Sequence, residues 1–96
     1  MKMVMVVYNE ALDDEVMGIL AEGASKNYTK ITGVLGDGVS SGSHLGTDIW
    51  PGLNNILYIA CKEAQANVMI EKVRELRKSI GHEGVKAFVL PLEEVT

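Results

Sequence analysis

The sequence has few of the features that mark secreted or membrane proteins. It contains one cysteine, Cys61, so no disulfide can form within the chain and a reducing compartment is expected. No run approaches the ~20 apolar residues of a membrane-spanning helix. The apolar segment 1–8 is too short for a secretory signal and leads directly into polar residues. We therefore expect a cytoplasmic protein that does not insert into a membrane.

Positive charge is also scarce. The 96 residues include nine Lys and Arg against 13 Asp and Glu, which gives a formal net charge of −4 at pH 7. Because neutralising phosphates requires clustered cations, nucleic acid is not an expected partner. Five of the basic residues lie in or beside one predicted helix, among glutamates, and are expected to form a solvated face: Lys62, Lys72, Arg74, Arg77 and Lys78.

Hydrophobic periodicity predicts six elements of secondary structure. Strands are expected at 2–8, 28–35, 53–61 and 86–90, where β-branched and aromatic residues alternate or run together. A short helix is expected between Asp13, as its N-cap, and Gly23. A longer helix is expected over 63–80, where Met69, Val73, Leu76 and Ile80 form one apolar stripe and Gly81 is a natural C-terminal stop.

The order strand–helix–strand, loop, strand–helix–strand predicts a single domain, 1–96, with a ferredoxin-like α/β (α+β) fold. In this βαββαβ arrangement a four-stranded antiparallel sheet has both helices on one face. The first strand is apolar on both sides, as at Met3 to Val6. The third strand is apolar on both sides as well, with Ile56, Tyr58 and Ala60 on one face and Leu57, Ile59 and Cys61 on the other. The uncovered sheet face is therefore expected to pack against another copy of the protein, which predicts a homo-oligomer.

A glycine-rich segment separates the two halves. Six of the ten glycines lie between Gly33 and Gly52, in a run that has no Lys or Arg. Loops of this length are uncommon in small domains and are usually functional or disordered. The segment is open to three interpretations: a linker, a ligand-responsive or partner-binding loop, or an ordered oligomer contact. The only Trp, Trp50, favours an anchored C-terminal end, with Asn54 and Asn55 as polar contacts near a cleft.

The chain resembles the nitrogen-regulatory PII family and its PII-like relatives. The resemblance rests on the short first helix LDDEVMGIL, the glycine turn GDGV at 36–39, the helix EKVRELR and the close KAFVLPLEEV. It implies a compact trimer that binds adenine nucleotides and small effectors in clefts between subunits. It also implies that the segment 36–52 corresponds to the family's T-loop, which controls a protein target such as a transporter or an enzyme.

The resemblance assigns ligand-binding roles to Gly36, Asp37 and Gly38 at the glycine turn, and to Gly81, Gly84 and Lys86 before and within the last strand. His44 and Trp50 are expected to act in the loop. The stretch GHEGVK lacks the family's full glycine- and aspartate-rich phosphate turn, and no arginines follow the last strand. These departures weaken the expectation of an adenine nucleotide and leave the identity of the effector open.

No arrangement typical of a catalytic or metal site is visible. The sequence has no Ser-His-Asp or Cys-His pattern and no HxxH, CxxC or HExxH spacing, so an enzyme is not expected, and Cys61 is expected to be a buried small hydrophobe. The alternative function is divalent-metal binding on the same fold, as in the divalent-cation tolerance proteins. It would use His44 or His82 with carboxylates drawn from Asp37, Asp48 and Glu83. A structural subunit without a ligand is the third possibility.

Overall fold

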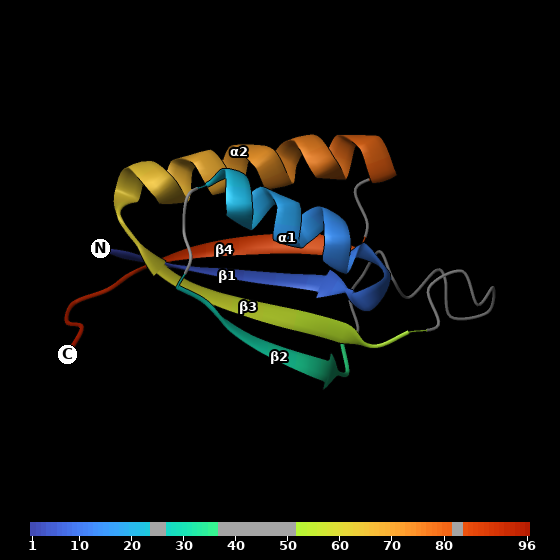
Figure 1. Cartoon of the computed structure of the whole chain (residues 1–96), viewed down its shortest axis with the longest axis horizontal. Helices are drawn as coiled ribbons and strands as arrows, with labels where there is room; N and C mark the ends of the chain where they lie inside the picture. The colour runs from blue at the N-terminus through green and yellow to red at the C-terminus, as the bar shows by residue number, and fades with distance from the viewer. Residues whose placement is uncertain (24–26, 37–51, 82–83) are drawn as a thin grey trace.

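The computed structural model describes residues 1–23, 27–36, 52–81 and 84–96. The elements follow the order β1 (Lys2–Asn9), η1 (Glu10–Leu12), α1 (Asp13–Glu22), β2 (Thr29–Val34), β3 (Asn54–Cys61), α2 (Glu63–Ile80) and β4 (Val85–Pro91) (Figure 1). Each strand and helix predicted from the sequence is present, with ends shifted by a residue or two. The βαββαβ, ferredoxin-like fold is therefore confirmed.

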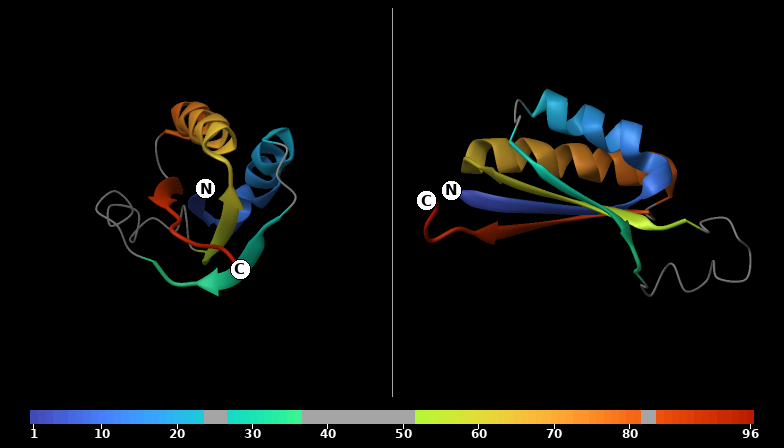
Figure 2. Two further views of the ribbon diagram at one scale, coloured as in Figure 1. Left: turned by 90° about the vertical axis from the view of Figure 1, so that its left-hand side faces the viewer. Right: turned by 60° about the horizontal axis from the view of Figure 1, so that its bottom comes forward.

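The four strands form one antiparallel sheet in the order β2-β3-β1-β4. Both helices cover the same face of the sheet (Figure 2), and none of the other described residues covers the opposite face, which we call the uncovered face. The two central strands, β1 and β3, pair without interruption from Lys2 opposite Cys61 to Asn9 opposite Asn54. The edge strand β2 is less regular, because its pairing with β3 has a register shift between Ile31 and Val34.

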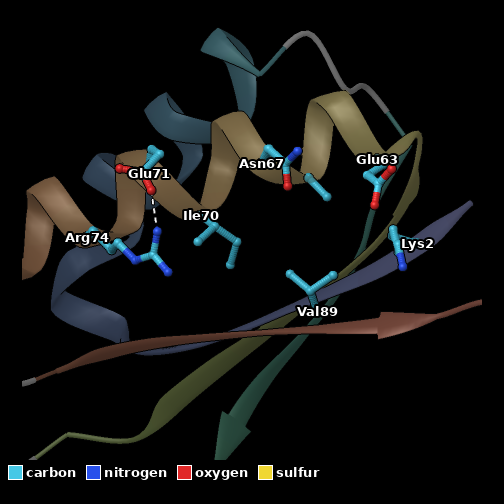
Figure 3. A pocket seen from close by; sticks show the side chains of 8 residues that line it. Lys2, Glu63, Asn67, Ile70, Glu71, Arg74 and Val89 are labelled. Atoms are coloured by element: carbon cyan, nitrogen blue, oxygen red, sulfur yellow. Dashed lines mark hydrogen bonds and ion pairs between the residues drawn. The ribbon is translucent and has the colours of Figure 1, made fainter.

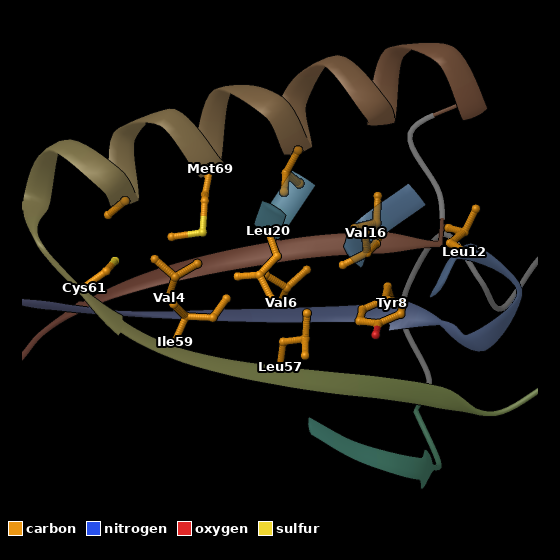
Figure 4. Close-up of a cluster of buried hydrophobic side chains, with 13 residues drawn as sticks. Val4, Val6, Tyr8, Leu12, Val16, Leu20, Leu57, Ile59, Cys61 and Met69 are labelled. Atoms are coloured by element: carbon orange, nitrogen blue, oxygen red, sulfur yellow. The ribbon is translucent and has the colours of Figure 1, made fainter. Parts of the chain in front are cut away.

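The hydrophobic core lies between the sheet and the two helices (Figure 4). Side chains in a strand alternate between the two faces, so only every second strand residue contributes to it. The buried hydrophobic residues are Val4, Val6, Tyr8, Leu12, Val16, Leu20, Leu57, Ile59, Cys61, Ala66, Met69, Val73 and Val85. Cys61 is buried as expected, and its burial raises the pKa of its thiol above the ordinary value.

The uncovered sheet face is also apolar. The register aligns Tyr58, Met5 and Phe88 in one row across three strands. Met3, between Ala60 and Leu90, occupies the next row. These side chains are half-buried or exposed in the single chain, although they alternate with the fully buried core positions. A contiguous apolar patch of this kind marks an interaction surface.

Asp13 is not the N-cap that the sequence predicted. The side chain of Asn9 caps the preceding turn, η1, by accepting a hydrogen bond from the Ala11 N–H at 2.9 Å. Asp13 follows as the first residue of α1, so its carboxylate is free to bond elsewhere. The end of α2 agrees with the prediction, because Gly81 adopts the left-handed conformation (φ 87°) that glycine accepts without strain.

The two chain ends lie together. Lys2 is paired with Pro91, and the Leu92 N–H donates to the carbonyl oxygen of Met1 at 3.2 Å. Both termini are therefore at the opposite end of the sheet from the place where β2 ends and β3 begins (Figure 1). None of the helices formed by the described residues is long and apolar enough to cross a membrane.

Candidate functional site

The candidate site lies at the end of the sheet where β2 ends and where β3 and β4 begin. Gly36 follows β2 at this end, and Gly52 and Leu53 precede β3. The central strand β1 ends between them and bonds to both neighbours beyond the regular ladder. The Glu10 N–H donates to the Leu53 carbonyl at 3.0 Å, and the Asn9 N–H donates to the Gly84 carbonyl at 2.7 Å. These two consecutive backbone donors thus fix Leu53 and Gly84, which lie close to the ends of the segments 37–51 and 82–83 in the sequence.

Gly84 has two reasons to be glycine. Its φ of +88° lies in the left-handed region, and a Cβ there would stand 3.1 Å from the Leu12 side chain. Gly81 also has a positive φ, and its N–H bonds to the Arg77 carbonyl at the end of α2. Gly36 is close to the side chain of Asn54, since a Cβ on it would lie 2.5 Å from the amide nitrogen. The backbone conformation or a close neighbouring side chain therefore explains why glycine occupies each of these three positions, whether or not it contacts a ligand.

Lys86 lies near the start of β4, directly opposite Val7, and is exposed. Val7 belongs to the set of β1 residues on the uncovered face, so Lys86 is on that face as well. A lysine here places a cation at the rim of the apolar patch, close to the end of the sheet that holds Gly36 and Gly84.

The predicted ligand residues that the structure describes do not form one group within a single chain. Gly36 follows the edge strand β2, whereas Gly84 and Lys86 belong to the other edge, at β4. Two strands separate these edges, and with ~4.8 Å between neighbouring strands the distance across them is about 14 Å. Asp37, Gly38, His44 and Trp50 lie outside the described residues, as do His82, Glu83 and Asp48 of the metal alternative. In the ranges that the structure does describe, no three His, Cys, Asp or Glu side chains are placed to hold a metal ion.

A polar cluster that the sequence did not predict lies on the helix side of this end. One carboxylate oxygen of Asp13 accepts hydrogen bonds from the Tyr8 hydroxyl at 2.6 Å, the Lys30 ammonium at 2.9 Å and the Asn55 side-chain amide at 3.4 Å. The three donors come from β1, β2 and β3. Asn55 was expected beside a cleft, but it faces the helices and is buried, because its partner across the ladder is Tyr8.

The contacts of the cluster shift two pKa values in opposite directions. The pKa of the Tyr8 hydroxyl is raised far above its ordinary value, mainly by burial and also by its bond to Asp13. The pKa of the Asp13 carboxyl is lowered, because Tyr8 and then Lys30 donate hydrogen bonds to its ionised form. Asp13 is thus held as a carboxylate, and Tyr8 as a neutral hydroxyl.

The lowered pKa of Asp13 predicts an acid-dependent loss of stability. A carboxyl whose pKa is depressed in the folded state contributes stability above its unfolded pKa and loses it as the pH falls through the folded pKa. Stability should therefore decline from about pH 5 downward, and Asp13→Asn should reduce this decline. Urea unfolding from pH 7 to pH 2 measures it. Asp14→Asn, an exposed neighbour in the same helical turn, is the control; equal flattening in both variants would contradict the assignment.

A groove runs between α2 and the edge strand β4 (Figure 3). Its two parts, of about 320 and 360 Å³, share Ile70, Arg74 and Val89. Arg74 is paired with Glu71 across one turn of the helix. One part extends away from the candidate site to Lys2, and the other reaches Lys86. The groove therefore lies mainly on the helix side, and at Lys86 it reaches the β4 edge that borders the uncovered face.

Comparison with known proteins identifies the family. The family model described as "Nitrogen regulatory protein P-II" matches residues 1–96. Among solved structures, CPII from Thiomonas intermedia K12, bound to ADP, AMP and acetate, has a TM-score of 0.72 at 16% identity, covering 93% of this chain and 82% of that chain. A putative PII-like signaling protein from Thermus thermophilus has a TM-score of 0.65 at 24% identity, covering 92% of this chain and 81% of that chain. No curated protein sequence matches the chain significantly.

The two kinds of comparison support different statements. At these identities the solved structures establish the fold, in agreement with the strand order and the two helices on one face. The family model spans every described element, from β1 to the residues after β4. The chain therefore belongs to the nitrogen regulatory protein P-II family.

Proposed function

We propose that the protein is a homotrimeric PII-like regulator that binds an adenine nucleotide, ADP or AMP, in clefts between subunits. Nucleotide binding would act on a protein target through the segment 36–52. Membership of a regulatory family gives the general class. The choice of nucleotide is supported by the structural relative CPII, which is described as bound to ADP and AMP.

The proposal depends on the placement of Gly36 at one edge of the sheet and of Gly84 and Lys86 at the other. A head-to-tail ring joins two different surfaces of neighbouring protomers, and in the proposed trimer these are the β2 edge of one protomer and the β4 edge of the next. Gly36 of one chain and Lys86 of its neighbour would then border the same cleft. The apolar uncovered face supplies the surface that such a ring would bury.

Lys86 provides the sharpest test of the nucleotide site. If its ammonium contacts a phosphate, Lys86→Ala removes a charge-assisted hydrogen bond worth about 1.5–3 kcal/mol, so nucleotide affinity should fall about 10- to 100-fold. Calorimetric titration of ADP and AMP measures the affinity. Lys62→Ala is the matched control, since Lys62 is exposed at the opposite end of the sheet and should leave affinity unchanged.

The outcomes separate the candidate functions. Failure of the unmodified protein to bind ADP or AMP, or an equal effect of the two lysine substitutions, would contradict the proposed site. A thermal shift with divalent copper or zinc, in place of nucleotide, would support the metal-binding alternative.

A further inference from the structure

The edge strand β2 pairs with one neighbour, β3, and irregularly. It pairs with β3 at Thr29, Lys30 and Ile31, then passes through a register shift before Val34 meets Asn54. Gly33, inside the shift, has a φ of +70°. Most of the strand is exposed. Because β2 leads directly to Gly36, the position of this strand determines where the chain leaves the sheet at the candidate site.

Lys30 links this strand to the helix layer. It faces the helix side, opposite the buried Leu57, and its Nζ lies 2.9 Å from an Asp13 carboxylate oxygen. The Lys30 side chain is 23% exposed and that of Asp13 is 37% exposed. An ion pair this exposed usually adds little to overall stability. The effect of the ion pair on the position of β2 depends on how firmly its acceptor, the Asp13 carboxylate, is held in place.

The acceptor is fixed by the core. The same oxygen of Asp13 accepts the Tyr8 hydroxyl, and Tyr8 is only 1% exposed. Asn55, 5% exposed, donates to it at 3.4 Å. Both donors belong to the central strands, which pair along their whole length. Lys30 therefore attaches a loosely held edge strand to a point that is already rigid, so that only one long side chain loses freedom on pairing.

We propose that the contact of Lys30 with Asp13 is a positioning contact that holds β2 against α1 and so sets where Gly36 meets the effector. Asp13 serves as the fixed acceptor, and Lys30 is the positioning residue. This inference rests on the proposed function for its effect on ligand binding. Its effect on β2 itself does not depend on that function.

The first experiment tests the strand without any ligand. Lys30→Met keeps most of the aliphatic stem and removes the ammonium. Amide hydrogen exchange at 29–34 should become about fivefold faster, because local opening of β2 loses an ion pair, while exchange in β1 and α2 stays the same. Asp13→Asn, which keeps an acceptor for Tyr8, should have a similar effect on β2. Lys30→Arg should restore the original rates.

Lys72→Met is the matched control. Lys72 pairs with Glu22 at 3.1 Å and joins the two helices without touching β2. The proposal is overturned if β2 exchanges at the original rate in Lys30→Met, or if Lys72→Met accelerates it equally. It is also overturned if Asp13→Asn alone has the effect, since the ion pair would then not be responsible.

The second experiment tests the connection to the site. In Lys30→Met, affinity for ADP should fall about 3- to 10-fold through misplacement of Gly36, although Lys86 is intact. If exchange in β2 rises but ADP affinity is unchanged, the contact positions the strand without serving the site, and that part of the proposal is wrong. If the unmodified protein does not bind ADP, the proposed function fails, while the exchange measurement still decides the role of Lys30.

Discussion

Replacing Met5 with glutamate is expected to dissociate the proposed trimer into monomers. Met5 occupies the centre of the uncovered sheet face, between Tyr58 on β3 and Phe88 on β4. In a single chain the side chain is only half-buried, so a carboxylate can reach water and the fold should persist. In an assembly that covers this face, the carboxylate would lose its hydration, at a cost of several kcal/mol for each protomer. A cost of this size, repeated at each protomer, should prevent assembly.

Light scattering after size-exclusion chromatography would measure the change. The unmodified chain should have about three times the 10.4 kDa mass of one chain, and Met5→Glu should have the mass of one. Val68→Glu is the control, because Val68 is an exposed apolar residue of α2, on the covered side of the sheet. If Met5→Glu remained a trimer with a native circular dichroism spectrum, the uncovered face would not be the interface.

Leu57→Ala is expected to cause a large loss of folding stability. Leu57 is completely buried, lies opposite Val6, and fills the centre of the layer between sheet and helices (Figure 4). Truncating a buried leucine removes apolar contacts and leaves a cavity, which typically costs about 2–5 kcal/mol. Because a small domain has only about 5–15 kcal/mol of stability, this loss is a large fraction of the total.

Urea unfolding at equal protein concentrations measures this loss, since assembly makes apparent stability depend on concentration. Leu35→Ala is the control, because Leu35 is 84% exposed in the single chain. A loss below about 1 kcal/mol for Leu57→Ala would place Leu57 outside the tightly packed core.

The fold was accessible from the sequence because local patterns and tertiary structure agree. The stripe of Met69, Val73, Leu76 and Ile80 indeed faces the core, with the first two buried and the others packed against it. The alternation in β3 also separates the two faces correctly, with Leu57 inside and Tyr58 on the uncovered side. Periodicity identifies such faces because each depends only on residues close in the chain.

The polar cluster could not be predicted in the same way. Asp13 preceding an apolar run has the sequence signature of an N-cap, and nothing local indicates that Asn9 caps the turn before it. The partners of Asp13 at Lys30 and Asn55 are 17 and 42 residues away. They meet only because the order β2-β3-β1 brings three strands together. The separation of Gly36 from Lys86 depends on this same strand order. Predicting each strand on its own does not give the order, so it does not give the separation either.

The adjacency of the two chain ends has a practical consequence. Lys2 lies beside Pro91, at the opposite end of the sheet from Gly36 and Gly84. An affinity handle or a surface tether joined to either terminus therefore extends away from the proposed nucleotide cleft. Protein immobilised through Thr96 on a biosensor should present its cleft to the flowing analyte. A dye attached at that terminus should report on assembly without obstructing ligand entry.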